Sequence, residues 1–226
     1  MESKIVLILF VGLCGNFEYP CDSTDDWGCI RDFLASTGQC DKASHEDGVP
    51  LKMEDIHTYV PKLNVSLISK DCEVTFHGSK ILDFYMNKDS NNLILTVDFD
   101  AITLVTPRTI FNFERFGKDP LVIEEYINIT YSAAITIRIA WSDHIDVDDL
   151  RASGYVKDGS PSFIIGPKVT ESSNEIVQNA LAGLEADIPT VMQELWLTKA
   201  YYYTCVFLNK FLCDFGYLYD GRINRP

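Results

Sequence analysis

The segment from Ile127 to Trp141 reads INITYSAAITIRIAW, and its side chains alternate in character at every step. The even positions are small, polar or charged, whereas the odd positions are all apolar or aromatic: Ile127, Ile129, Tyr131, Ala133, Ile135, Ile137, Ile139 and Trp141. Because successive side chains of a β-strand point to opposite faces, this pattern predicts one strand with a buried face and a solvent face. At roughly 3.3 Å per residue it would span about 50 Å, which favours a strand that bends around a packed partner.

Similar but shorter patterns precede this segment. Alternation predicts strands over residues 63–68, 72–77, 80–87 and 93–105, and a weaker one over 155–169. Residues 89–92 (DSNN) indicate a tight turn, and residues 29–40 predict a short helix that ends near Gly38. A series of long strands with no helix between them is typical of an antiparallel sheet.

The spacing of apolar residues becomes helical after Ser172. Ser172 and Glu175 have the separation of a capping box, and apolar residues then recur at helical intervals as far as Phe211. Pro189 interrupts this run, which therefore predicts one long interrupted helix or two helices in series. The expected fold is α+β: a long C-terminal amphipathic helix wrapped by a long, strongly curved antiparallel β-sheet.

The first 15 residues have the features of a secretory signal peptide. Lys4 precedes the apolar run IVLILFVGL, which is too short to span a membrane. Small residues at positions 12 and 14 allow cleavage after Cys14, and a cut one or two residues later is also possible. We therefore expect residues 1–15 to be a signal peptide and residues 16–226 to form a single secreted domain.

Seven cysteines are present, and the one at position 14 falls in the signal peptide. The six that remain are Cys21, Cys29, Cys40, Cys72, Cys205 and Cys213. An even number in an oxidising compartment predicts three disulfides, with 15 possible pairings. Cys21 and Cys29 bracket a polar segment that can turn, which makes a local loop plausible. On a continuous helix Cys205 and Cys213 would lie about 12 Å apart, so they can pair only if the helix ends between them.

Two N-glycosylation sequons occur, at Asn64 (NVS) and Asn128 (NIT). Asn128 falls on the polar side of the long strand, and Asn64 alternates with the apolar residues Leu63, Val65 and Leu67. Both asparagines are therefore expected to point outward and to be glycosylated.

Charge and motif content exclude several functional classes. The formal net charge of −14 argues against nucleic acid and anionic membranes as partners, because both require a basic surface. The four histidines occur in unrelated contexts, and no nucleophile-elbow or HExxH motif is present. Acidic residues near His144 lack the glycine and terminal glutamate of an EF-hand. We expect no catalytic residues, no cofactor and no metal site.

Several motifs carry a resemblance to a known family. Cys21 with residues 29–33 (CIRDF), residues 50–56 (PLKMEDI), the long strands and the final helix resemble the insect takeout and juvenile-hormone-binding superfamily. Residues 119–123 (DPLVI) leading into residues 128–131 (NITY) are more similar to fibrohexamerin, the small glycoprotein of silk fibroin. The resemblance implies a takeout-like curved sheet around a long helix, and it implies the Cys21–Cys29 disulfide.

The resemblance also implies a function. A fibrohexamerin-like chain would be a secreted structural silk component that associates non-covalently with silk fibroin heavy and light chains and keeps them soluble. The alternative is an extracellular carrier of an apolar small molecule, juvenile-hormone-like or lipid-like, which would need an internal cavity of several hundred Å³. Cys40, Cys72, Cys205 and Cys213 exceed the minimal cysteine pattern of takeout-like carriers, which favours the fibrohexamerin-like function. The tyrosines of residues 201–203 and 217–219 are candidates either for partner contacts or for core and rim positions.

Overall fold

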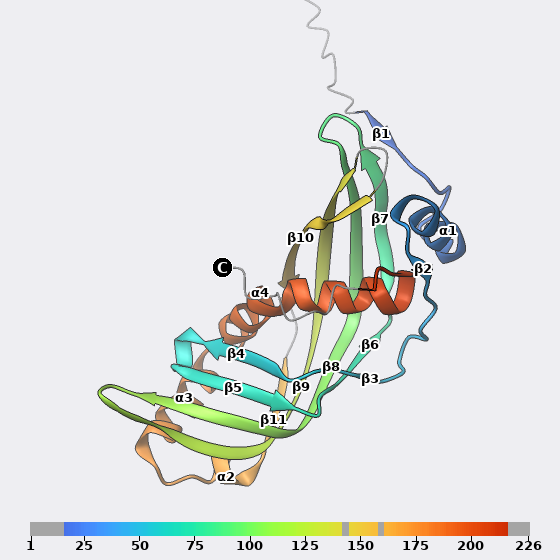
Figure 1. The fold of residues 1–226 in the computed structure, drawn as a ribbon. Coiled ribbons are helices and arrows are strands. Elements are labelled where there is room, and N and C mark those ends of the chain that lie inside the picture. Colours follow the sequence, from blue (N-terminus) through green and yellow to red (C-terminus); the bar gives the residue numbers. More distant parts are fainter. Residues whose placement is uncertain (1–15, 142–144, 158–160, 217–226) are drawn as a thin grey trace, which may run out of the picture.

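The computed structural model describes residues 16–141, 145–157 and 161–216 (Figure 1). The largest element of the fold is one antiparallel sheet, whose ten strands are β1 (Phe17–Glu18), β3 (Leu51–Lys52), β4 (Ile56–Val60), β5 (Val65–Lys70), β6 (Glu73–His77), β7 (Lys80–Asn87), β8 (Asn92–Arg115), β9 (Lys118–Trp141), β10 (Ile145–Val156) and β11 (Ser162–Ile165). A separate two-stranded sheet joins β2 (Asp41–Lys42) to β12 (Cys213–Asp214). The expectation of a large antiparallel sheet is confirmed.

The hairpin of β8 and β9 organises the main sheet. Each strand has 24 residues, and the turn between them contains Gly117, whose φ of 67° favours glycine. Strands β7, β6 and β5 pair with β8, whereas β10 and β11 pair with β9. Register shifts after Phe99 and Thr106 mark bulges, which bend the hairpin as Figure 1 shows. The expected strand over residues 127–141 is thus the second half of a longer one.

Alternation along β9 separates a buried face from an outer face, as expected. The odd positions from Ile127 to Ile139 are each at most 7 % exposed. Trp141, at the end of the strand, is partly buried and stacks on Phe33 with 5.6 Å between ring centroids. Ala134 is buried as well, although it lies on the even side.

Helices contribute the second layer. They are α1 (Trp27–Gly38), the 3₁₀ turn η1 (Pro61–Leu63), α2 (Pro167–Thr170), α3 (Glu175–Ala186), α4 (Ile188–Phe207) and the π-helical turn η2 (Leu208–Leu212). Helix α1 ends at Gly38, as the sequence predicts. The expected strand over residues 155–169 is wrong at its C-terminal end, because Pro167 begins the short helix α2, where the fixed φ of proline suits a first helical turn.

The C-terminal helical region consists of two helices in series. Pro189 lies in the first turn of α4, where its missing N–H is not needed. Asp187 caps α4 by accepting a hydrogen bond from the Thr190 N–H at 3.3 Å. The predicted capping box is wrong, because Asn174 rather than Ser172 caps α3, accepting from the Ile176 N–H at 3.0 Å.

Helix α4 runs across the strands of the sheet, and its C-terminal end lies near β2 (Figure 1). Every residue from Tyr203 to Phe207 is buried, so this end is enclosed on all sides rather than amphipathic. The ring of Phe207 stacks on Phe211 (centroids 4.8 Å apart) and meets Phe76 and Phe99 edge to face. In the part of the chain that the structure describes, no helix is long and apolar enough to cross a membrane.

Candidate functional site

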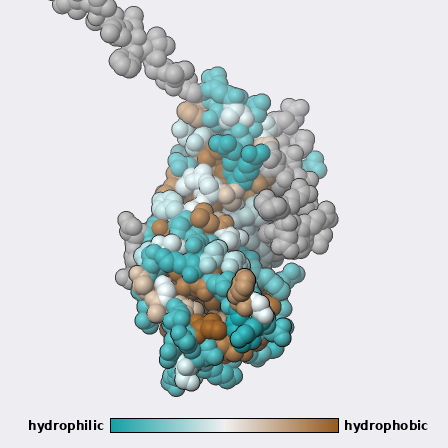
Figure 2. All heavy atoms as spheres, turned by 90° about the vertical axis from the view of Figure 1, so that its left-hand side faces the viewer, coloured by the Kyte–Doolittle hydropathy of each residue, from teal (hydrophilic) through white to brown (hydrophobic). Residues whose placement is uncertain are grey.

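An apolar hollow opens between α3, α4, the β4–β5 hairpin and the bend of β8 and β9. Its walls include Leu63, Phe163, Leu181 and Leu195, and its volume is about 40 Å³. Figure 2 shows hydrophobic residues gathered in the lower part of this side of the molecule, surrounded by hydrophilic ones. A volume of this size is far below the several hundred Å³ that a lipid-like ligand occupies.

A second hollow of about 40 Å³ adjoins the first and carries polar groups. The hydroxyls of Tyr131 and Tyr203 share a hydrogen bond there, and burial raises the pKa of both phenols. Lys199 also lines this hollow and donates to the His57 carbonyl, while burial lowers the pKa of its ammonium group. The sequence pattern identified the apolar stripe of α4 but gave no signal for the position of Lys199.

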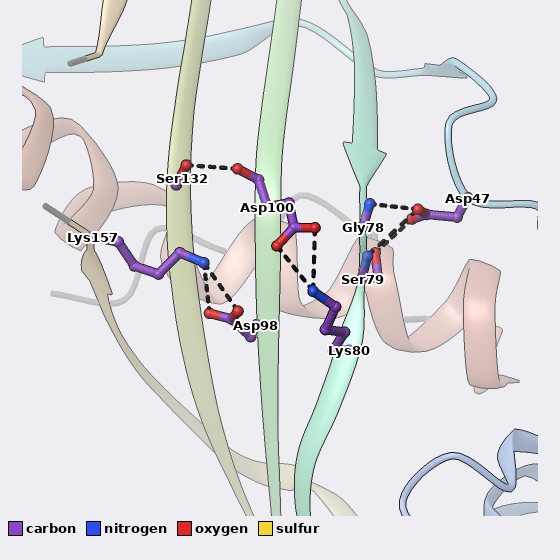
Figure 3. Close-up of polar contacts among 8 residues, drawn as sticks. All are labelled: Asp47, Gly78, Ser79, Lys80, Asp98, Asp100, Ser132 and Lys157. Atoms are coloured by element: carbon purple, nitrogen blue, oxygen red, sulfur yellow. Dashed lines mark hydrogen bonds and ion pairs between the residues drawn. The ribbon is translucent and has the colours of Figure 1, made fainter. Parts of the chain in front are cut away.

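The outer face of the sheet carries a network of ion pairs and hydrogen bonds (Figure 3). Lys157 binds Asp98 at 2.9 Å, and Lys80 binds Asp100 at 3.3 Å. Asp47, from the loop after β2, accepts hydrogen bonds from the Gly78 N–H and the Ser79 hydroxyl, each at 2.6 Å. These contacts tie β7, β8 and the end of β10 together across the sheet surface.

This network pairs its carboxylates with lysines, with backbone N–H groups or with the Ser79 hydroxyl. Ser132 adds a bond from β9 by donating to the Asp100 carbonyl at 2.6 Å (Figure 3). Among the described residues no group of three or more His, Cys, Asp or Glu side chains is arranged to hold a metal ion. The contacts of this network link neighbouring strands across the outer face of the sheet.

Asn64 lies at the end of η1, not inside a strand. Its φ of 52° is left-handed, a conformation that asparagine adopts more readily than most residues, and its side chain is exposed. The Tyr59 hydroxyl donates to Oδ1 of Asn64 at 2.9 Å, and Nδ2 of Asn64 donates to the Glu114 carbonyl at 3.5 Å. The expected outward direction holds for Asn64, although a turn and not strand alternation produces it.

Asn128 lies on the outer face of β9, where strand alternation placed it. The strand is paired there on both sides, with Val105 of β8 and Ile164 of β11 opposite Asn128. The Asn128 side chain is partly exposed. The sequon threonine, Thr130, faces the same side and lies 3.4 Å from the Thr103 hydroxyl.

Four cysteines form two disulfides in the structure. Cys21 is joined to Cys29, which staples the segment before α1 to its first turn. Cys40 is joined to Cys213 across 173 residues, so this bond ties the segment after α1 to the end of the C-terminal helical region. The same pair of segments forms the small β2–β12 sheet.

The expected third disulfide is absent, and the assignment of Cys72 and Cys205 to disulfides is wrong in this structure. Both are buried free thiols. Cys72 follows β5 and accepts a hydrogen bond from Thr106 at 3.7 Å, and burial raises its pKa. Cys205 lies in α4, where burial raises the pKa of its thiol to about 12. Cys205 and Cys213 do not pair, because helical structure continues from Phe207 through η2 to Leu212.

The remaining candidates do not converge on one site. His45 binds the Val49 carbonyl at 3.0 Å, whereas His57 and His77 belong to β4 and β6. His144 lies outside the described residues, as do the tyrosines at positions 217 and 219. Tyr203 is buried, and its two preceding neighbours are partly buried, which is the core-and-rim arrangement.

Comparisons with known proteins give a family match and a structural similarity. The family model described as Fibroin P25 matches residues 18–217. No curated protein sequence matches the chain. The crystal structure of Takeout 1 from Epiphyas postvittana is similar with a TM-score of 0.44 and 14 % sequence identity, over 82 % of this chain and 87 % of that one.

Proposed function

Because this chain belongs to the fibroin P25 family, we propose that it is a secreted structural component of silk. In this proposal it associates non-covalently with silk fibroin heavy and light chains and keeps them soluble until they are spun. Residues 1–15 act as a signal peptide that is removed on secretion, and Asn64 and Asn128 carry N-linked glycans. The chain is not an enzyme and needs no cofactor.

The state of the cysteines is the observation that supports a non-covalent association. Within the described part of the chain, Cys21, Cys29, Cys40 and Cys213 are consumed in intrachain disulfides. Cys72 and Cys205 are buried, and the raised pKa of each thiol keeps it protonated and unreactive near neutral pH. No described cysteine is thus available at the surface to form a disulfide with a partner chain.

The acidic charge supports the solubilising part of the proposal. A formal net charge of −14 makes bound complexes repel one another, and glycans on the surface would add hydration. Some carboxylates are neutralised locally, as Asp98 and Asp100 are by Lys157 and Lys80, but acidic residues remain in excess.

The decisive experiment is purification of the native protein from the secreting gland, followed by mass spectrometry of the proteins that accompany it. We expect fibroin chains to co-purify without reductant, to stay bound when reductant is added, and to be released by a denaturant without reductant. A complex that dissociates only on reduction would contradict non-covalent association. A protein that emerges free of fibroin would contradict the silk role itself.

One observation favours carriage of an apolar molecule as a second candidate: the wall of the first hollow consists of apolar side chains. At about 40 Å³ it would have to widen before a lipid-like ligand could enter. Native mass spectrometry of the purified protein tests this candidate, because a carrier would retain one small molecule per chain. Replacing Ala180 in the wall of the hollow with Phe should abolish retention by a carrier and leave fibroin association unchanged.

A further inference from the structure

Asn128 occupies the centre of a row of side chains on the outer face of the sheet. Val105 of β8 and Ile164 of β11 are its direct cross-strand partners, one on each side. Partners of this kind have Cβ atoms about 5 Å apart. Tyr126, two residues before Asn128 on β9, points to the same face.

The neighbours of Asn128 are unusually exposed for apolar residues in a sheet. Ile164 is 54 % exposed, Val105 38 % and Tyr126 37 %. Together they form an apolar patch in which Asn128 is the central residue. Apolar side chains that gather on the surface of a soluble protein commonly mark a place where something else binds.

Asn128 is itself partly exposed between its two aliphatic cross-strand neighbours. A glycan attached to its side-chain amide would therefore start at the surface of the sheet, within reach of these apolar side chains. Asn64 differs, because its amide is bonded to Tyr59 and Glu114 at an exposed turn.

We propose that the N-linked glycan of Asn128 folds back over Val105, Ile164 and Tyr126 and covers this patch. The inference rests on the glycosylation in the proposed function and assigns that glycan a place on the protein. The apolar faces of the first sugar rings contact the aliphatic and aromatic side chains, and the sugar hydroxyls face water. The patch is thus covered by a group covalently attached at its centre. The glycan of Asn64 projects from its turn instead.

The test compares the secreted glycoprotein with the variants Asn128→Gln and Asn64→Gln, which each lose one sequon. Glycopeptide mass spectrometry first measures the occupancy of both asparagines. We expect Asn128→Gln to increase the fluorescence of a dye that binds apolar surface and to lower Tm by about 2–4 °C relative to Asn64→Gln. Adding Val105→Thr and Ile164→Thr to the Asn128→Gln variant should return the dye fluorescence to the wild-type level, because threonine keeps the branched shape but removes apolar surface.

A second measurement on the unaltered protein guards against a variant that fails to fold. A peptide N-glycosidase should release the Asn64 glycan from the native protein well before the Asn128 glycan, and both at equal rates after denaturation. Absence of glycan from Asn128 would overturn the proposed glycosylation and this inference with it. Full occupancy, with equal release rates in the native protein and equal dye binding by the two variants, would overturn only the covering of the patch.

Discussion

The indole of Trp196 in α4 lies directly against the backbone of Gly154 in β10. A methyl group on Gly154 would overlap the indole nitrogen and would stand 2.9 Å from the Ala134 carbonyl oxygen of β9. Trp196 is buried and stacks on Tyr203, with 5.6 Å between ring centroids. The absence of a side chain at Gly154 therefore sets how closely α4 approaches the sheet.

We predict that Gly154→Ala destabilises the protein by about 1–3 kcal/mol, because the added methyl group overpacks a rigid contact. Denaturant unfolding followed by tryptophan fluorescence measures the change. Gly183→Ala is the matched control. It adds the same methyl group inside α3, 3.2 Å from a flexible Leu63 side chain, and helix propensity favours it by up to about 1 kcal/mol. Equal destabilisation by both changes would contradict the prediction.

Gln193 connects α4 to the outer edge of β10. Its Oε1 accepts from the Val156 N–H at 3.0 Å, and its Nε2 donates to the Gly154 carbonyl at 3.5 Å. The side chain thereby replaces part of a neighbouring strand. We predict that Gln193→Ala costs about 1–2 kcal/mol of unfolding free energy and speeds amide exchange at Val156. Gln178→Ala, at an exposed position of α3, should change neither quantity.

The two disulfides should differ in their contribution to stability. The chain-entropy model gives about 5 kcal/mol for a loop as long as that of Cys40–Cys213, whose cysteines are 173 residues apart. It gives about 2.5 kcal/mol for Cys21–Cys29, whose cysteines are 8 apart. We therefore predict that replacing both cysteines of the long-range bond with serine destabilises the protein more than the same change in the local one. Urea unfolding of the two double variants decides between this order and its reverse.

The buried thiols should be inaccessible in the native protein. For the secreted chain without residues 1–15, a thiol reagent such as Ellman's reagent should detect no reactive cysteine at pH 8 in native buffer. In denaturant without reductant it should detect two, Cys72 and Cys205. Rapid native labelling of either would show that the region around it opens readily. Labelling of neither in denaturant would show that the two are joined in a disulfide.

Stability should fall in alkaline solution. The pKa of the Cys205 thiol rises from 9.0 to about 12 on burial, so the folded state holds this proton more tightly than the unfolded state. The resulting contribution is fully present below pH 9 and is lost as the pH rises from 9 towards 12. Tyr202, which is partly buried and whose pKa rises from 10.0 to about 12, acts in the same direction above pH 10.

Melting temperatures between pH 7 and 10.5 test this dependence. We expect a decline that begins near pH 9, and a shallower decline for Cys205→Ala, which removes one titrating group. Ala43→Ser, which changes a partly exposed position without adding a group that titrates in this range, is the control and should follow the wild-type curve. An identical slope for Cys205→Ala and wild type would show that another group controls the alkaline transition.

Strand alternation could be read directly from the sequence because it is a local property. The odd residues of 127–139 are buried because the strand has a period of two, whatever lies opposite. Pro189 likewise marks the break between α3 and α4. Proline is tolerated in the first turn of a helix but disrupts the interior of one, so a helix that contains Pro189 begins close to it. The turn at Asn64 could not be predicted from the sequence pattern, because a 3₁₀ helix of three residues is too short to produce a periodic pattern of apolar residues.

The sequence did not predict which cysteines of distant segments form disulfides. Cys40 meets Cys213 only because the end of the C-terminal helical region returns to the segment after α1, and nothing near either cysteine encodes that return. Cys72 and Cys205 are both buried free thiols, although each lies close enough to Tyr202 to influence its pKa. The even number of cysteines predicted three disulfides, whereas three-dimensional proximity decides which pairs form, and the structure has two.

The sequence by itself thus determined the local features: the long strands and their buried face, the helical C-terminal region, and the outward direction of Asn128. Tertiary structure alone decided which strands flank Asn128, how closely Trp196 approaches Gly154, and how little space remains between helices and sheet. The physical reason is the range of the interactions. Periodicity and proline act over a few residues, whereas register, close packing and disulfides depend on segments that folding brings together from far apart in the chain.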